Sequence, residues 1–244
     1  MTEALSPHPP LPDYYGEPAG REQFVRELFD HTAHWYDDIN DMLSFGSGGR
    51  YRREALVRAG LTNGMRLLDM ATGTGVVARE ALKITPHVIG ADASIGMLRA
   101  GRRRQRTPIM ESVGERIAAR DGSFDMIVTG YALRHFADLH GVFSEYRRVL
   151  RPGGRVLILE LTPPRSRAAY VALRFYMNRI VPLLARLRSG DREAATLMHY
   201  YWDTIDTCVP PERILDALRG AGFTGVARHV AFGMCSEYTG TKKG

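Results

Sequence analysis

Apolar residues along the middle of the chain alternate between short continuous runs and longer stripes at helical spacing. The short runs have the length of buried strands and hold few charged residues. They lie at 65–70, 88–91, 124–129 and 155–161. Amphipathic helical patterns follow the first three of them, and such an alternation is typical of a parallel sheet with helices on both faces. This part of the chain is therefore expected to be α/β.

The two ends of the chain show other patterns. The first 18 residues hold five of the 13 prolines, which predicts a flexible lead-in with little ability to bury itself. Helical spacing predicts helices over about 21–60 and again over 166–205, outside the strand–helix alternation. A proline-first, glycine-last pattern over 210–222 predicts one more helix, and 223–239 predicts an antiparallel strand pair.

Composition narrows the class of protein only modestly. A chain of 244 residues is long enough for one large domain or for one domain with a cap. The net charge of +6 permits an anionic partner without requiring one. Cys208 and Cys235 have no disulfide or metal-ligand spacing, there is no apolar run of about 20 residues, and the N-terminus does not read as a signal peptide. We therefore expect a cytoplasmic location.

The most specific segment is LLDMATGTGVVA at 67–78, which predicts a strand, a small-residue loop and a helix. Gly73 and Gly75 allow the backbone to approach a ligand, and the N–H groups of the following helix can bind an anion. The loop fits the dinucleotide pattern but does not separate NAD from S-adenosylmethionine, and a tight turn without a ligand is the structural alternative. Asp92 ends the second run, where it can bind ribose hydroxyls or simply cap the helix at 94–103.

The downstream segments FDMIVTGYALRHF at 124–136 and RRVLRPGGRVLILEL at 147–161, together with this loop, resemble the class I S-adenosylmethionine-dependent methyltransferases. With LFDHTAHWYDDINDMLSFG at 28–46, the chain is similar to the ubiquinone/menaquinone biosynthesis C-methyltransferase family, from about Leu28 to the terminal strand pair. The resemblance implies a Rossmann-like fold: a doubly wound, mostly parallel seven-stranded sheet with an antiparallel last strand, plus a helical cap. It also implies S-adenosyl-L-methionine as cofactor and C-methylation of a quinol- or phenol-type acceptor.

The same resemblance divides the chain into five units. These are a flexible lead-in, an N-terminal helical cap, a cofactor-binding core, a helical insertion over the substrate site, and a last helix with the strand pair that completes the sheet. Their expected ranges are 1–20, 21–60, 61–165, 166–209 and 210–244.

Matching positions with the family's motifs implies a set of cofactor contacts at the methionine end, the ribose, the adenine and the floor of the site, with a tyrosine closing over them. These residues are Ala71, Gly73, Thr74, Asp92, Val113, Gly114, Gly130 and Tyr36. The chain departs from the family's usual residues at Val76, Val113, Gly130 and His135. Backbone contacts tolerate such changes, whereas the loop at 130–135 usually faces the acceptor.

The chemistry expected of a ring-carbon methylation points to two catalytic candidates. A phenolate is a far better carbon nucleophile than a neutral phenol, so a positive group or a base near the hydroxyl is expected. Arg134 is predicted to face the substrate and stabilise the phenolate, and His135 to accept the proton unless it points away from the pocket. The apolar segment 170–187, with Trp35 and Tyr36, is predicted to wall the acceptor pocket, with packing on the N-terminal helices as the alternative.

Other interpretations remain open at this level. The fold can serve another small metabolite, at carbon, oxygen or nitrogen, or a non-catalytic cofactor-binding subunit. The expected partners are a small hydrophobic acceptor, no nucleic acid, at most peripheral membrane contact, and, by resemblance, a second copy in a homodimer. No metal is expected, because His31 and His34 have no third ligand of the right type nearby, and the arginines of 101–106 suit a helix C-terminus.

Overall fold

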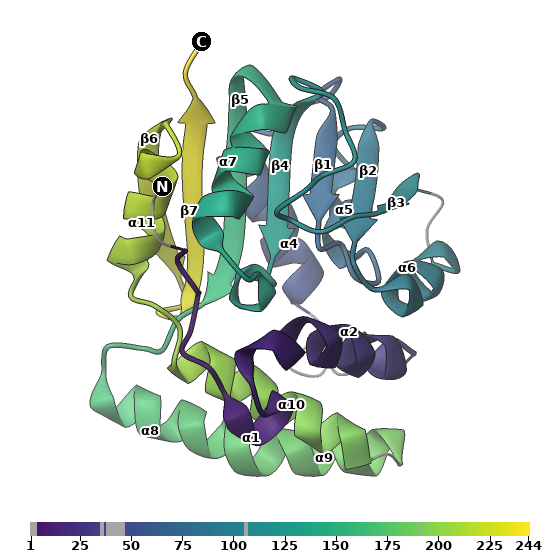
Figure 1. Cartoon of the computed structure of the whole chain (residues 1–244), viewed down its shortest axis with the longest axis vertical. Helices are drawn as coiled ribbons and strands as arrows, with labels where there is room; N and C mark the ends of the chain where they lie inside the picture. Colours follow the sequence, from purple (N-terminus) through teal and green to yellow (C-terminus); the bar gives the residue numbers. More distant parts are fainter. Residues whose placement is uncertain (1–3, 35–36, 38–46, 105–106, 191) are drawn as a thin grey trace.

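Seven strands form one mixed sheet in the order β3-β2-β1-β4-β5-β7-β6 (Figure 1). The computed structural model describes residues 4–34, 37, 47–104, 107–190 and 192–244. Strands β1 to β5 pair in parallel, and β7 runs antiparallel to both β5 and β6. The strands are β1 (Leu67–Met70), β2 (Val88–Asp92), β3 (Ile109–Glu111), β4 (Phe124–Gly130), β5 (Leu150–Leu161), β6 (Phe223–Ala231) and β7 (Cys235–Lys242). The predicted doubly wound sheet with an antiparallel strand is confirmed.

Successive residues of the central strands face opposite layers of helices, because side chains alternate across a strand. Leu68 and Ile127 pack under α7 (Leu139–Val149) and α11 (Pro211–Gly220). Leu67 and Met126 pack under α4 (Gly48–Arg58) and α5 (Val76–Ala81), on the other face. Because both faces are covered, β1 is buried along its whole length, as its unbroken apolar run predicts.

A layer of helices lies across the carboxyl ends of the parallel strands (Figure 1). It has its own apolar core, in which Leu28 packs with Met177, Val181 and Trp202. Its helices are α1 (Pro12–Tyr15), α2 (Arg21–Thr32), α8 (Arg167–Phe175), α9 (Val181–Ser189) and α10 (Arg192–Asp206), and α6 (Ile95–Arg102) packs against α2 at the sheet edge. The loops that follow β1, β2 and β4 therefore lie between the sheet and this cap.

The proline-rich start of the chain is ordered, contrary to the expected flexible lead-in. Leu5 is buried, and its backbone exchanges hydrogen bonds with Asp138 and Leu139 at the start of α7. The Pro7 carbonyl accepts a hydrogen bond from the Val209 N–H. Proline-rich backbone lacks donors, but here two carbonyls and the Leu5 side chain find partners that lie far away in the sequence.

Candidate functional site

A cavity of about 750 Å³ lies between the carboxyl ends of the parallel strands and the cap. One group of lining residues follows β1, β2, β3 and β4, and the other comes from the N-terminal segment, α1 and α2. The first group includes Ala71, Gly73, Thr74, Asp92, Val113, Gly114, Gly130 and His135. In open α/β sheets this edge is where ligands bind.

The glycine loop between β1 and α5 has the backbone geometry that its sequence predicts. Gly73 has a φ of 56° and Gly75 a φ of 84°, values that favour glycine. Gly101 of α6 allows a second close approach, because a Cβ there would lie 3.2 Å from the Thr74 carbonyl carbon. Ala71 is also left-handed, with a φ of 58°, although it has a side chain. Such strain concentrates at ligand sites.

Asp92 supports the glycine loop and faces the cavity. Its Oδ2 accepts a hydrogen bond from the Gly73 N–H at 2.8 Å, and its Oδ1 accepts one from the Ser94 N–H at 2.8 Å. The N-cap of α6 is Ser94, whose hydroxyl accepts from the Met97 N–H, so Asp92 is not the residue that caps the helix. Burial raises the pKa of the Asp92 carboxyl to about 6, against the opposing effect of these hydrogen bonds.

Asp69 holds the same loop from inside the core. It accepts hydrogen bonds from the Thr72 hydroxyl at 2.6 Å and from the Ala78 N–H at 3.0 Å, and so joins the loop to the first turn of α5. Burial raises the pKa of its carboxyl to about 7, although these two bonds favour the charged form.

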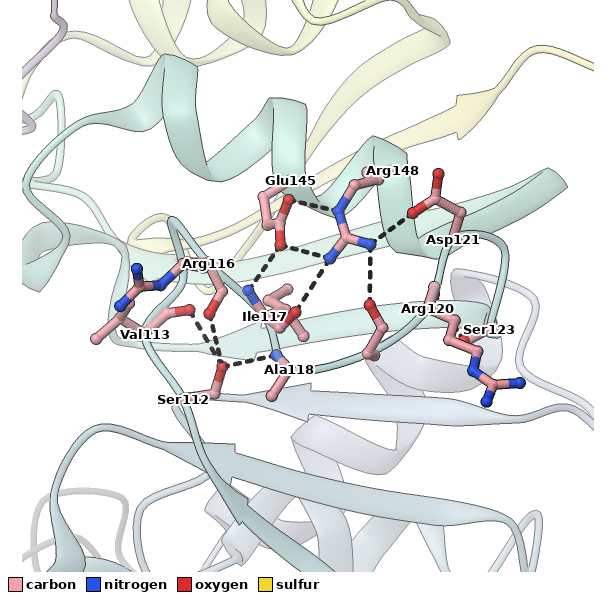
Figure 2. A network of polar contacts seen from close by, with 11 residues as sticks. Ser112, Val113, Arg116, Ile117, Ala118, Arg120, Asp121, Ser123, Glu145 and Arg148 are labelled. Carbon is pink, nitrogen blue, oxygen red and sulfur yellow. Dashed lines mark hydrogen bonds and ion pairs between the residues drawn. The ribbon is translucent and has the colours of Figure 1, made fainter.

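The loop that carries Val113 and Gly114 is held both by α7 and by its own hydrogen bonds, in which the Ser112 hydroxyl donates to the Arg116 carbonyl and accepts from the Ala118 N–H. Figure 2 shows the Arg148 guanidinium bonded to Glu145, to Asp121 and to loop carbonyls. Glu145 in turn accepts the Ile117 N–H at 2.7 Å. Because Val113 and Gly114 line the cavity, α7 indirectly positions the wall predicted to contact adenine.

The short turn after β4 separates the two predicted catalytic residues. Residues Leu133–His135 form a 3₁₀ turn, in which neighbouring side chains point about 120° apart, since such a helix has three residues per turn. His135 lines the cavity, whereas the Arg134 side chain is fully buried and is not among the lining residues. The structure therefore corrects the prediction that Arg134 faces the substrate.

The Arg134 side chain instead contacts other buried side chains. Its Nε donates to Glu160 Oε1 at 2.9 Å, its Nη1 donates to the Thr204 hydroxyl at 2.7 Å, and its guanidinium stacks over the Tyr201 ring at 4.3 Å. The bonds join the end of β5 to α10. Breaking a buried ion pair of this kind typically costs about 3–5 kcal/mol.

His135 lies among aromatic rings. Its imidazole makes an edge contact with Phe29 and stacks with Tyr200, at centroid distances of 5.1 and 5.7 Å. Among the described residues, neither ring nitrogen has a hydrogen-bond partner. Burial, followed by the positive charges of Arg134 and Arg21, lowers the imidazole pKa well below its usual value. His135 is therefore neutral at physiological pH, and both of its ring nitrogens are buried without a partner in the described structure.

Sequence analysis did not identify the three arginines that line the cavity, Arg21, Arg26 and Arg52, of which Arg26 is ion-paired with Glu22. Arg21 donates to the Arg134 carbonyl at 2.8 Å and lies 3.0 Å from His8 Nε2, with no carboxylate partner in the described chain. Arg52 lies over the Tyr131 ring at 4.8 Å and likewise makes no ion pair with a described residue. All three are on helices outside the glycine-loop motif, and their patterns resemble those of ordinary surface arginines.

Two other sequence predictions concern the cap. Trp35 and Tyr36 lie outside the described residues, so Tyr36 remains a prediction. No described residue of α8 or α9 lines the cavity, which corrects the expectation for 170–187; the segment packs on α10 and the N-terminal helices instead. Asp37, which sequence analysis did not single out, links the cap to the loop through the Thr74 hydroxyl and Arg104.

The lining residues fit S-adenosylmethionine. A Cβ on Gly73 would meet no atom within 4 Å, so the loop presents open backbone to the cavity. The Asp92 carboxylate is available at the end of β2 for ribose hydroxyls, and Arg52 is available for the carboxylate of the amino-acid end. The ribose and the amino-acid end of the cofactor each have a chemically suited side chain among the lining residues.

Comparisons with known proteins agree with this geometry. Residues 18–242 match the model of the ubiE/COQ5 methyltransferase family. The chain is 33% identical to the demethylmenaquinone methyltransferase of Deinococcus radiodurans, over 93% of this chain and 96% of that protein. It is 34% identical to the ubiquinone/menaquinone biosynthesis C-methyltransferase UbiE of Geobacter sulfurreducens, over 89% of this chain and 88% of that protein.

Among solved structures, an S-adenosylmethionine-dependent methyltransferase from Thermotoga maritima has the same fold, with a TM-score of 0.64. It is 19% identical and covers 90% of this chain and 100% of its own. The chain therefore belongs to the ubiE/COQ5 methyltransferase family and is an S-adenosylmethionine-dependent methyltransferase.

Proposed function

We propose that this enzyme methylates a ring carbon of a hydrophobic quinol in quinone biosynthesis, from the cytoplasm. The observation that carries the proposal is the second half of the cavity lining. There Tyr15, Val25 and Phe29 surround a neutral His135 and an Arg21 without a carboxylate partner in the described chain. Glu22 and Arg26 also line this half but are ion-paired with each other, and the aromatic and apolar side chains around His135 and Arg21 suit an aromatic ring that carries a hydroxyl. The names of the relatives from Deinococcus and Geobacter support the same acceptor class.

His135 is proposed to receive the acceptor hydroxyl. A neutral imidazole with a free ring nitrogen accepts a hydrogen bond from a phenolic O–H and can take its proton as the ring attacks. The low pKa of His135 disfavours a lasting imidazolium, so the proton passes on to water and the residue returns to its neutral form. When bound, the cofactor would supply an electrophilic methyl group and keep the electron pair of the broken sulfur–methyl bond as a thioether. The ring carbon that receives the methyl group then loses its own proton to water.

Arg21 is proposed to take the role that the sequence suggested for Arg134. Negative charge develops on the ring oxygen as the hydroxyl loses its proton, and a fixed guanidinium in an apolar cavity stabilises that charge. Arg21 is held in place by Ser6, His8 and the Arg134 carbonyl, and its Nε is buried without a partner in the described structure. The side chain is therefore positioned before any acceptor binds.

The test is methyl transfer from labelled cofactor to a panel of hydroquinones with increasing prenyl length, simple phenols and small polar metabolites. We expect label on a ring carbon of the hydroquinones, with Arg21→Gln lowering kcat by about 100-fold. Arg21→Lys should restore part of the rate. Cofactor affinity, measured by calorimetry, should stay within about twofold of the parent protein in both variants.

Controls separate this role from folding. Gln23→Ala, on the exposed side of the same helix, should leave the rate unchanged, and Arg134→Gln should lower Tm through the unpaired Glu160. If Arg21→Gln lowers Tm along with kcat, the residue has a structural role and not the proposed one. If a polar metabolite is methylated in preference to the hydroquinones, the proposed quinol acceptor is wrong, although the protein is still a methyltransferase.

A further inference from the structure

The outermost helical segment of the cap, residues 167–189, exposes a strip of large apolar side chains. Phe175 is 60% exposed and Leu187 is 72% exposed, values far from those of core residues. The complete strip is Val171, Phe175, Ile180, Leu183, Leu184 and Leu187. The opposite side of the segment is buried, with Met177, Val181 and Ala185 packed on α10. The strip therefore faces away from the rest of the molecule, and we call it the outer strip.

A π-helical turn keeps the outer strip on one side. Residues spaced by four drift around a regular α-helix, which has 3.6 residues per turn. Between α8 and α9 the Val181 N–H donates to the Tyr176 carbonyl, five residues back, and this wider turn takes up part of the drift. Pro182, which lacks an N–H, follows directly, and the helix continues through it. The backbone thus aligns Phe175 with Leu183 and Leu187.

The charges beside the outer strip have one sign. Between Glu160 and Asp191 the sequence contains six arginines and no acidic residue. Arg174, Arg179 and Arg186 are exposed, and each precedes a strip residue by one position, so they follow one border of the strip. None of these three is in an ion pair with another residue that the structure describes. Such a border attracts anions and repels a copy of itself.

We propose that the outer strip and its arginine border dock this protein on an anionic phospholipid surface. Apolar side chains flanked by arginines alone are the pattern of a helix that lies in the plane of a membrane interface. A symmetric dimer through the same strip would place arginine borders together with no acidic residue in 161–190 to neutralise them. No helix of the described chain is long and apolar enough to cross a bilayer, so the contact would be peripheral.

Vesicle flotation tests this with the full-length protein, without cofactor or acceptor, so the result does not depend on the proposed reaction. We expect binding to vesicles of equal parts phosphatidylglycerol and phosphatidylcholine, weakened by salt, and little binding to phosphatidylcholine alone. The triple change Arg174→Gln, Arg179→Gln, Arg186→Gln should lower the partition coefficient about 100-fold. Phe175→Ser with Leu187→Ser should lower it at least about tenfold at low salt.

Matched controls use equally exposed residues elsewhere. Phe232 is 82% exposed at the β6–β7 turn, so Phe232→Ser tests a generic apolar effect. Arg103→Gln, Arg120→Gln and Arg213→Gln together test the loss of three charges away from the strip. The proposal is overturned if these controls weaken binding as much as the strip variants, or if phosphatidylcholine alone binds equally well. It is also overturned if sedimentation velocity shows a dimer that Phe175→Ser with Leu187→Ser dissolves.

Discussion

Two carboxyl groups shape the behaviour of individual residues at the cofactor site. Asp69 and Asp92 lie at the ends of neighbouring strands, and burial raises the pKa of both, to about 7 and about 6. The Asp69 carboxylate is fully buried, whereas the Asp92 carboxylate is partly exposed and lines the cavity, where a ligand's hydroxyl groups can reach it. The arrangement thus lowers the stability of the ligand-free protein and leaves Asp92 as the predicted acceptor for ribose hydroxyls.

The first prediction follows from the sign of that shift. Below about pH 4 the Asp92 carboxyl is protonated in both folded and unfolded chains. Between about pH 4 and pH 6 only the folded chain keeps the proton, so stability falls as pH rises, and above that range the loss is constant. Asp92→Asn should therefore raise the Tm of ligand-free protein at pH 8 by about 3 °C, with a smaller gain at pH 5.

Thermal unfolding at the two pH values checks this, together with a cofactor titration. Affinity should fall about ten- to a hundred-fold, because a charge-assisted pair of hydrogen bonds is lost. The exposed Asp216→Asn serves as the control and should show no gain at pH 8. A variant less stable than the parent at pH 8 would mean that the bonds from Gly73 and Ser94 outweigh the burial of the charge.

At the scale of elements, α7 serves the cofactor site without touching it. Arg148 lies in its last turn and bonds to two carbonyls, at Ile117 and Ala119, in the loop between β3 and β4 (Figure 2). The Ser112 hydroxyl also bonds within this loop, so the guanidinium adds to bonds that the loop makes itself. The helix therefore helps to position Val113 and Gly114 indirectly.

The second prediction concerns the loss of the Arg148 hydrogen bonds to this loop. Arg148→Met should lower Tm and weaken cofactor binding by at least about tenfold, because the loop must then be ordered by the ligand. Calorimetry measures the affinity, and hydrogen exchange of residues 112–123 measures the order of the loop. Arg147→Met, one position earlier on the same helix, should change neither. If cofactor affinity stays constant while the loop exchanges faster, the loop contributes nothing to binding.

A helix or strand was predictable from the sequence where its buried side produces a regular pattern of apolar residues. The strands β1, β2, β4 and β5 are continuous apolar runs in the sequence. The glycine loop is marked by Gly73 and Gly75, which both have a positive φ in the structure. Strand β3 has three residues at the sheet edge, too few to show a pattern. Arg134 and His135 are adjacent in sequence, yet their directions depend on a 3₁₀ turn that no pattern announces. Arg21 lies at the cavity because of the way the cap helices pack, which no local sequence pattern shows.

The whole molecule consists of a sheet covered by helices on both faces and a helical cap, which meet at the edge where the cavity lies. The start of the chain bridges them: it hydrogen-bonds to α7 and to the residue that leads into α11, and then it enters the cap as α1 (Figure 1). Ser6 and Pro10 of this segment also line the cavity. A segment that the proline content marks as flexible thus closes the site, because its partners lie more than 130 residues away in the sequence.

The third prediction tests whether this bridge holds the layers together. Leu5 is 7% exposed in the core beneath α7, and removing its side chain beyond Cβ should cost about 2 kcal/mol. Leu5→Ala should therefore lower Tm by roughly 4–8 °C and raise KM for the acceptor, while the cofactor Kd changes little, since the hydrogen bonds of Leu5 go to Asp138 and Leu139 and not to the glycine loop. Val57→Ala, which shortens an exposed side chain on α4, is the control and should leave all three quantities in place. Protease cleavage within residues 4–20 should become faster in Leu5→Ala but not in the control. An unchanged Tm with rapid cleavage in both proteins would mean that the N-terminal segment detaches freely, and the cavity wall would then have to come from the helices of the cap.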